Sequence, residues 1–460
     1  MKMERFAERS LAKWIDKTNR KPLVIRGARQ VGKSTLVQQF AKANDLTLHE
    51  VNLERHLTLT DVFKSQNTGR ILRELEYICQ QGLIDREGSL LFLDEIQSIP
   101  VAMQSLRYLY EDFPHLPVIA AGSLLEFTLS KHSFSMPVGR IEYLHLYPMS
   151  FEETLEASGE EPLLKLLRDF QTAEDFPLSA HDRLLELQRT FLLVGGMPEA
   201  VCRFIETGSF DDAFDVHASI VDTYRDDFSK YATQAELLRL HKVYEYVPLA
   251  IGEKFKFVNV DPAEPARDIR KVVDLLMKAG IINLAFHSDA SGLPLQATAN
   301  QRIFKPFFLD CGLMNYLCGT RWINPSDLNK REFINEGKMA EQFIAQHLPF
   351  LSKSNTKPKL TYWLREGRST NAEVDFIVQL GPSIVPIEVK AGKSGTLKSL
   401  LLFAHQKNTP CAVRFDLNLP SLQTVRHSSG QKKQSVTVEF DLLSLPLYLV
   451  EQLPRIFKNN

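Results

Sequence analysis

The chain has 460 residues, of which 44% are hydrophobic and 24% are charged, with 55 Lys and Arg against 56 Asp and Glu. At roughly 100–200 residues per domain, this length predicts about three domains, and the composition excludes a disordered or fibrous chain. A net charge of −1 gives no global argument for a nucleic-acid partner. The five cysteines form no C-x-x-C pair and no run approaches 18 apolar residues, so we expect a soluble cytoplasmic protein with reduced thiols and no membrane span.

Apolar segments alternate with helix-length segments over the first 155 residues. The segments expected as strands are 22–27, 46–53, 89–96 and 116–123. Strands separated by helices are typical of a mainly parallel, doubly wound sheet. The sequence therefore predicts an α/β fold for this part of the chain.

The segment GARQVGKS at 27–34 fits the P-loop pattern G-x-x-x-x-G-K-[ST] and directly follows an apolar strand. Gly27 and Gly32 allow the backbone to turn its N–H groups toward phosphate oxygens, Lys33 reaches the β- and γ-phosphates, and the Ser34 hydroxyl can bind Mg²⁺. A glycine-rich turn that binds nothing is the alternative. The residues expected to bind ATP are Gly27, Ala28, Arg29, Gln30, Val31, Gly32, Lys33, Ser34 and Thr35, together with Asp94 and Ser123.

The strand LLFLDEIQ at 90–97 ends in two acids. Asp94 is placed to hold Mg²⁺, and Glu95 is the candidate base that polarises the attacking water, although such a pair also commonly begins a helix. Ser123, at the tip of the next strand, is a candidate sensor of the γ-phosphate. Arg140 follows a glycine and can either serve a neighbouring subunit's nucleotide or be an ordinary surface arginine.

The middle of the chain is mainly helical. The segment 266–280 predicts an amphipathic helix with basic residues on one side, and the following IINLAFHSDASGLPLQ predicts strand, turn and strand. Helices followed by a small hairpin suggest a winged helix that binds DNA, whereas a solvated basic face is the alternative.

The C-terminal part contains AEVDFIVQLGPSIVPIEVKAG at 372–392, which predicts two strands joined by a turn. Asp375, Glu388 and Lys390 form the pattern D-x₁₂-E-x-K, and Glu341 on an upstream helix can add a third acid. Two or three carboxylates can bind Mg²⁺ or Mn²⁺ while Lys390 activates water for attack on a phosphodiester. This pattern is typical of the restriction-endonuclease-like, or PD-(D/E)xK, arrangement, but acids and a lysine at strand ends can also be surface residues. Glu373 faces the same side as Asp375 and is a candidate for assistance or for solvation.

A locally basic stretch follows this pattern and is the place where we expect a phosphate backbone to be tracked, unless it is only a solvated face. Its members are Lys390, Lys393, Lys398, Lys407, Arg414, Arg426, Lys432 and Lys433. An acid-rich stretch near 152–186 offsets this stretch and the basic side of 266–280. The near-zero net charge is therefore weak evidence against nucleic acid.

The series IRGARQVGKST, LLFLDEIQ, AAGS, GRIEYLHLYPMSFEE and GGMPEAV resembles a family of bacterial and archaeal AAA-like ATPases with a C-terminal domain of unknown function. The resemblance implies ATP hydrolysis, oligomerisation, a winged helix and an endonuclease-like domain. The domains expected are an AAA-like P-loop core at 1–155, a helical lid at 156–235, a winged helix at 236–330 and a PD-(D/E)xK endonuclease-like domain at 331–460.

These patterns predict Mg²⁺-dependent ATP hydrolysis coupled to action on duplex or branched DNA by a homo-oligomer, with cleavage at the C-terminal site left open. The alternative is an ATP-dependent oligomerising switch in signalling or defence, whose C-terminal domain only binds a partner. A small-molecule kinase is disfavoured because Asp94 and Glu95 suit water activation.

Overall fold

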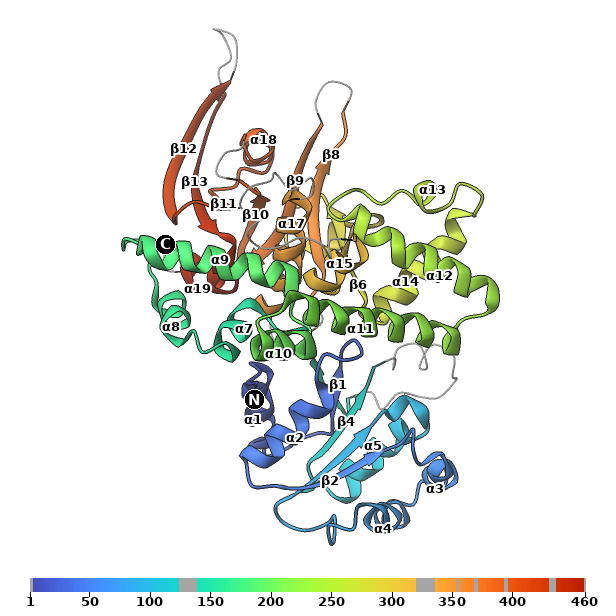
Figure 1. Ribbon diagram of the computed structural model, residues 1–460. Helices are drawn as coiled ribbons and strands as arrows, with labels where there is room; N and C mark the ends of the chain where they lie inside the picture. The colour runs from blue at the N-terminus through green and yellow to red at the C-terminus, as the bar shows by residue number, and fades with distance from the viewer. Residues whose placement is uncertain are drawn as a thin grey trace. The chain divides into compact units, whose positions relative to one another are not determined.

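The computed structural model describes residues 3–123, 139–319, 336–352, 355–356, 358–367, 371–392, 396–429 and 436–458. The chain divides into two compact units (Figure 1). The first unit comprises Met1–Met149 with the short segments Asp274–Ile281 and Lys353–Lys357. The second comprises Ser150–Val273, Ile282–Ser352 and Pro358–Asn460.

The first unit is built on a five-stranded sheet in the order β2-β3-β4-β1-β5, in which every pairing is parallel. Its strands are β1 (Leu23–Arg26), β2 (Thr47–Asn52), β3 (Ser89–Asp94), β4 (Val118–Gly122) and β5 (Glu142–His145). The parallel α/β sheet predicted for this part is confirmed. Because β1 lies between β4 and β5, the loop after β1 leaves from the interior of the sheet, and the carboxyl ends of β1, β3 and β4 meet at one edge.

Helices and an apolar core stabilise this sheet. The helices are α1 (Ala7–Ile15), α2 (Lys33–Ala43), α3 (Thr60–Lys64), α4 (Thr68–Cys79) and α5 (Ala102–Asp112). All six side chains of β3 are buried, as expected for a central parallel strand covered on both faces. Leu91 and Leu93 of β3 pack in one cluster with Leu106 of α5 and Ile71 of α4.

The second unit begins with a mainly helical stretch. A capping box starts its first helix, because Ser150 Oγ accepts a hydrogen bond from Glu153 N at 3.2 Å and the Glu153 carboxylate accepts one from Ser150 N at 3.0 Å. The helices are α7 (Phe151–Ala157), α8 (Glu161–Asp169), α9 (Leu178–Val194), α10 (Pro198–Thr207), α11 (Phe210–Tyr231), α12 (Gln234–Tyr246), α13 (Phe257–Val260) and α15 (Cys311–Leu317). A further helix, α14 (Ala266–Lys278), belongs to the second unit up to Val273 and to the first unit from Asp274. None of the helices in the described ranges is long and apolar enough to cross a membrane.

An eight-stranded mixed sheet, in the order β12-β13-β11-β10-β9-β8-β6-β7, forms the rest of the second unit. Its strands are β6 (Ile282–Ser288), β7 (Ala299–Phe308), β8 (Leu360–Arg365), β9 (Ala372–Leu380), β10 (Ser383–Val389), β11 (Cys411–Asp416), β12 (Ser421–Ser429) and β13 (Val436–Pro446). Three further helices accompany them: α17 (Glu336–His347), α18 (Lys398–Lys407) and α19 (Leu453–Lys458). In Figure 1 the strands run from yellow-green to red, so segments distant in sequence share this sheet.

The sheet joins two segments that we expected as separate domains. The hairpin strand β6 pairs antiparallel with β7 and parallel with β8. The expected winged-helix segment 236–330 therefore contributes the last two strands, with β7 at the edge, to the sheet of the expected endonuclease-like segment. The second hairpin strand expected within 281–296 was placed wrongly: it lies at Ala299–Phe308, after a short 3₁₀ helix at Leu295–Thr298. The polar stretch before Leu295 is a longer connection than the simple turn that the sequence suggests.

A buried acid explains the first glycine, Gly195, of the GGMP segment. The Asp310 carboxylate is fully buried and accepts hydrogen bonds from Gly196 N at 2.6 Å, Leu313 N at 3.1 Å and Gln346 Nε2 at 3.0 Å. Gly195 has a φ of 73°, and a Cβ at this position would clash with the same carboxylate. Gly195 therefore allows the chain after α9 to turn closely over Asp310.

Candidate nucleotide site and C-terminal carboxylate cluster

The predicted P-loop connects β1 to α2 in the first unit. Gly32 has a φ of 89° and directly precedes α2, and a Cβ at Gly27 would collide with the backbone oxygen of Leu146. The loop therefore needs glycine at both positions where the pattern requires it. Lys33 begins α2, and its ammonium donates to Ala28 O at 2.7 Å and Gly27 O at 3.2 Å. The lysine is held inside the curve of the loop, beside a helix N-terminus that favours phosphate.

The two motifs that the sequence separates by sixty residues meet in space. Ser34 Oγ donates a hydrogen bond to Asp94 Oδ2 at 2.7 Å. Burial raises the pKa of the Asp94 carboxyl, while the hydrogen bond from Ser34 opposes this shift. A hydroxyl and a carboxylate are ligands that Mg²⁺ prefers, so this pair fits the metal of a bound nucleotide.

Burial also changes the charge equilibrium of the P-loop lysine. It lowers the pKa of Lys33 to about 8, while the nearby carboxylates of Glu95 and Asp94 act in the opposite direction. At neutral pH most of the lysine therefore keeps its proton, and the charged fraction falls as the pH rises through about 8.

Glu95 occupies an unusual backbone conformation at the end of β3. Its φ is 50°, in the left-handed region that non-glycine residues rarely adopt, and its N–H donates to Asp94 Oδ1 at 2.9 Å. The Glu95 carboxylate accepts a hydrogen bond from the Gln97 amide. Strained backbone of this kind is enriched at functional sites. The structure thus supplies a partner, Gln97, that the sequence analysis did not identify.

Ser123 and Arg140 complete the predicted residues of this unit. Ser123 is buried directly after β4, and the preceding Gly122 has no room for a Cβ because the Gln97 side chain lies against it. The ends of β3 and β4 are therefore in contact. Arg140 is half-exposed, and its Nε lies 3.4 Å from Glu111 Oε1. It follows residues 124–138, which lie outside the described part.

The predicted C-terminal residues also lie close together, and a lysine that was not predicted, Lys305, lies among them. Asp375 Oδ2 accepts a hydrogen bond from Val389 N at 2.7 Å, and the Lys390 ammonium donates to Glu388 Oε1 at 2.5 Å. The Lys305 ammonium lies 3.4 Å from Glu341 Oε2, 3.7 Å from Asp375 Oδ1 and in closer contact with the Glu373 carboxylate. We define Lys305, Glu341, Glu373, Asp375, Glu388 and Lys390 as the carboxylate cluster.

The acids in this cluster are strongly coupled. Burial, followed by repulsion from Asp375, raises the pKa of Glu341 to about 8 and that of Glu388 to about 7. Burial alone would lower the pKa of Lys305, but Glu341, Asp375 and Glu373 raise it above its ordinary value. Lys305 therefore stays charged.

Lys305 is the residue that the sequence analysis missed. It stands in the apolar strand β7, in the segment RIFKPFFLD, and its side chain is 0% exposed. A lysine is almost never fully buried unless it is paired with acids. A lone lysine among buried aromatic residues was therefore the signal that could have placed it beside the acids of β9.

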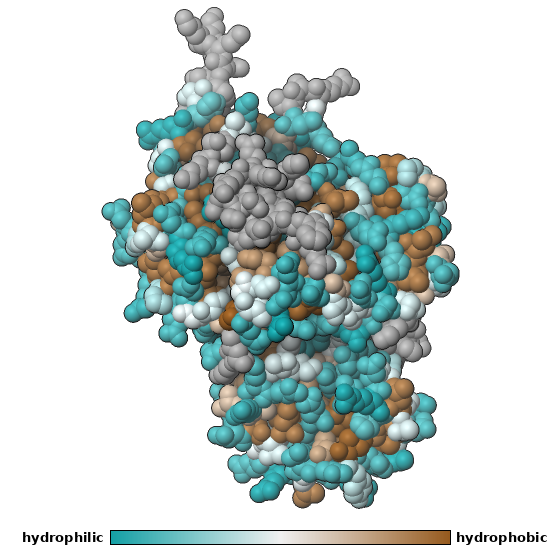
Figure 2. All heavy atoms as spheres, viewed as in Figure 1, coloured by the Kyte–Doolittle hydropathy of each residue, from teal (hydrophilic) through white to brown (hydrophobic). Residues whose placement is uncertain are grey.

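Several residues of the predicted basic faces are paired with acids. On α14, Arg267 and Lys271 both contact Asp268, at 3.4 and 3.3 Å. In the C-terminal stretch, Arg414 pairs with Asp416 at 2.9 Å and Arg426 pairs with Glu439 at 2.9 Å. Lys393, Lys432 and Lys433 lie outside the described residues. Figure 2 shows hydrophobic residues scattered among hydrophilic residues on the visible face.

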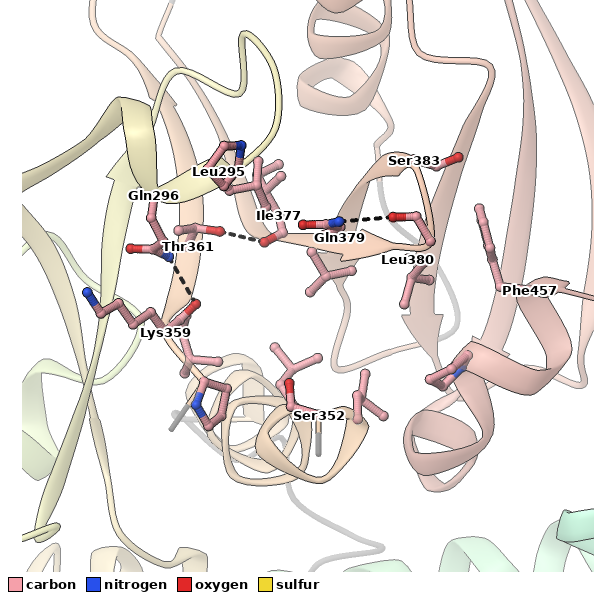
Figure 3. A pocket seen from close by; sticks show the side chains of 18 of the residues that line it. Leu295, Gln296, Ser352, Lys359, Thr361, Ile377, Gln379, Leu380, Ser383 and Phe457 are labelled. Carbon is pink, nitrogen blue, oxygen red and sulfur yellow. Dashed lines mark hydrogen bonds between the residues drawn. The ribbon is translucent and has the colours of Figure 1, made fainter. Parts of the chain in front are cut away.

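A separate pocket of about 820 Å³ lies in the second unit between the β9–β10 hairpin, the segment after α17 and the C-terminal helix (Figure 3). Several of its polar side chains are already bonded to backbone oxygens: Thr361 donates to Ile377 O at 2.6 Å and Gln379 to Gly381 O at 3.0 Å. No acid of the carboxylate cluster lines it. The pocket therefore lacks the chemistry that the sequence predicted for this unit.

The parallel sheet, the P-loop and the Ser34–Asp94 contact define a P-loop nucleotide-binding unit. Residues 19–155 match a family model described as an AAA domain (AAA_14). The fold, the site geometry and this match together support an AAA-like P-loop ATPase in the N-terminal part. Residues 185–324 and 336–422 match two domains of unknown function, DUF8612 and DUF4143.

Several solved structures share low sequence identity with the chain. No curated protein matches the chain. Among solved structures, the RuvB Holliday junction branch migration motor of Thermotoga maritima is 17% identical with a TM-score of 0.29, over 60% of this chain and 87% of that one. The ORC1 protein of Aeropyrum pernix in complex with DNA is 13% identical with a TM-score of 0.28, over 69% and 93%. PCH-2 of C. elegans is 13% identical with a TM-score of 0.22, over 40% and 54%. Scores this low carry no argument about function.

Proposed function

We propose that this chain hydrolyses ATP with Mg²⁺ at its P-loop unit and couples hydrolysis to action on DNA. The observation that carries the first part is the 2.7 Å contact between Ser34 Oγ and Asp94 Oδ2. It brings the hydroxyl of one motif and the acid of the other to a single point beside Lys33. A glycine-rich turn without ligand has no need of this convergence.

Each residue of this unit has a role in the proposal. The N–H groups of the P-loop and the Lys33 ammonium bind the phosphates, and Ser34 and Asp94 hold Mg²⁺. Mg²⁺, when bound, supplies positive charge that stabilises the phosphates. Glu95 orients and polarises the attacking water after it leaves Gln97, and Ser123 contacts the γ-phosphate. Arg140 acts on the nucleotide of a neighbouring copy in a homo-oligomer.

Exposed cations on α14 support the coupling to DNA. Arg267 and Lys271 of α14 have side chains that are 81% and 62% exposed, so they can reach a phosphate backbone despite their shared contact with Asp268. The winged-helix interpretation of 236–330 stays a proposal, and the joined sheet speaks against a free-standing domain there. The endonuclease-like fold of 331–460 is also a proposal, supported by the hairpin that carries Asp375 and Glu388.

A nucleotide-controlled switch is the second candidate. The observation that favours it is the pairing of the basic residues: Arg414 and Arg426 each have an acid as partner, which weakens the case for a phosphate track. In this case ATP controls oligomerisation, and the C-terminal part binds a protein partner. Mass photometry of Glu95→Gln with and without ATP distinguishes the switch by a nucleotide-dependent change of mass.

The proposal is tested by following ATP turnover and strand scission together. Wild type, Lys33→Ala and Glu388→Ala are compared on linear, forked and four-way DNA with Mg²⁺ or Mn²⁺. We expect Lys33→Ala to lose turnover, and wild-type turnover to rise when DNA is added. Absence of turnover in wild type contradicts the ATPase proposal. If no DNA stimulates ATP turnover and the protein does not bind DNA, the proposed ATPase activity stands and the proposed coupling to DNA is contradicted.

A further inference from the structure

The carboxylate cluster has a cation of its own. The Lys305 ammonium lies where acids from two different elements converge: Glu341 comes from α17, whereas Glu373 and Asp375 come from β9. The side chain of Lys305 is 0% exposed, so bulk water does not reach the ammonium. Glu373 is in the closest contact with the ammonium, Glu341 Oε2 lies at 3.4 Å and Asp375 Oδ1 lies at 3.7 Å, so acidic side chains surround it.

The same position is the one that a divalent cation would require. Mg²⁺ and Ca²⁺ need several oxygens converging on one point at roughly 2.0–2.6 Å. Here the acids converge on Nζ, while Asp375 Oδ2 is bonded to Val389 N and Glu388 Oε1 to Lys390. Within the described ranges, no group of three or more His, Cys, Asp or Glu is arranged to hold a metal. The residues present therefore do not fit the metal that the sequence predicted.

The surroundings hold the acids in place around the ammonium. Gly252 has a φ of 73°, and a Cβ there would lie 2.7 Å from Glu341 Oε2, so the backbone closes directly over this carboxylate. The ring of Tyr362 lies with its centroid 5.3 Å from Lys305 Nζ, a distance suited to a cation–π contact. An acid that moved toward a second cation would have to leave these contacts.

We propose that Lys305 takes the place of a divalent cation in the carboxylate cluster. The cluster is thus a metal-free ionic site that binds β7 and α17 to β9, and the second unit does not use it for metal-dependent cleavage of phosphodiesters. Lys390, which pairs with Glu388, completes the same ionic arrangement. This inference concerns the second unit alone and is independent of ATP hydrolysis in the first.

Mn²⁺ binding tests the inference on the full chain. Every sample is free of nucleotide and carries Ser34→Ala, so that binding at the P-loop unit is weakened, and free Mn²⁺ is followed by electron paramagnetic resonance. The parent chain is compared with Asp375→Asn, with Lys305→Met, and with Lys305→Met combined with Asp375→Asn. Lys254→Met is the matched control, because Lys254 pairs with Glu366 at 2.7 Å at the surface of the same unit.

We expect the parent, Lys254→Met and Asp375→Asn to bind Mn²⁺ equally weakly. Lys305→Met gains one site with at least about tenfold higher affinity, because the acids lose their cation, and the added Asp375→Asn abolishes it. Saturable Mn²⁺ binding by the parent that Asp375→Asn removes overturns the proposal, as does a folded Lys305→Met that gains no site. If Lys305→Met does not fold, the proposal is decided by comparing Mn²⁺ binding of the parent with that of Asp375→Asn: equal weak binding supports it, and saturable binding that Asp375→Asn removes overturns it. ATP turnover of the chain with Ser34 restored reports separately on the first unit.

Discussion

The buried position of Lys33 predicts a pH dependence of nucleotide binding. The pKa of this lysine is lowered to about 8 by burial. ATP binds the ammonium form, so affinity falls as the pH rises through this value. ATP affinity falls with rising pH because deprotonation of Lys33 removes the positive charge that pairs with phosphate. The nucleotide itself carries its full negative charge above neutral pH.

The magnitude follows from the fraction of charged lysine. Apparent affinity is divided by 1 + 10^(pH − pKa), which is about 1.1 at pH 7 and about 11 at pH 9 for a pKa of about 8. The dissociation constant for ATP should therefore rise about tenfold between these two pH values, equivalent to about 1.4 kcal/mol. Isothermal titration calorimetry without Mg²⁺ measures this dissociation constant directly.

Two variants separate this effect from general changes at high pH. Lys42→Ala removes an exposed lysine from the same helix and should keep the wild-type slope. Lys33→Ala should bind weakly with little pH dependence between pH 7 and 9. A wild-type affinity that stays constant to pH 9.5 would refute the reasoning, because it would mean that Glu95 and Asp94 fully compensate the cost of burying the ammonium.

Three further predictions concern the other residues. Glu95→Gln should keep ATP binding but lower turnover by about 10²–10³-fold, because the base is lost; the exposed Glu87→Gln is the control, and unchanged turnover contradicts the role. Arg140→Ala should lower ATP turnover by about 10³-fold, and mixing it with Lys33→Ala should restore activity if the arginine acts across subunits. Arg107→Ala is the matched control, because Arg107 contacts the same Glu111. Asp310→Ala should lower the free energy of unfolding by about 3 kcal/mol, because buried donors lose their acceptor. Urea denaturation measures this, with the exposed Asp289→Ala as control. Equal urea midpoints for the two variants contradict the prediction.

The P-loop site could be predicted because its determinants are local. Gly27, Gly32, Lys33 and Ser34 lie within eight residues, and the strand and helix around them are recognisable from hydrophobic pattern alone. Asp94 is distant, but in a parallel sheet the carboxyl ends of strands share one edge, so its meeting with Ser34 follows from topology. The order of the strands and the contact of Gln97 with Glu95 required the structure.

The carboxylate cluster could be predicted only in part because its partners are far apart in the chain. The hairpin carrying Asp375 and Glu388 is local, and alternation along β10 placed Lys390 beside Glu388. Lys305 reaches the acids only because β6 pairs with β8, which brings the β6–β7 hairpin to the edge of the larger sheet. Nothing in the spacing of charged residues indicates that pairing. The sequence therefore predicted a metal site at these acids and gave no indication that the Lys305 ammonium lies among them.

Local ion pairs accompany the charge offset that the sequence suggested. We expected an acid-rich stretch to offset separate basic faces, and some of the described basic residues are in addition paired locally, as Arg414 is with Asp416 and Arg426 with Glu439. A paired arginine must give up its carboxylate partner before it can bind a phosphate fully, so each contact adds less affinity than a free cation would. If the chain binds DNA, the decrease of its DNA affinity with rising salt should accordingly reflect only a few phosphate contacts. A slope of log affinity against log salt steeper than about −4 would show that the ion pairs open on binding.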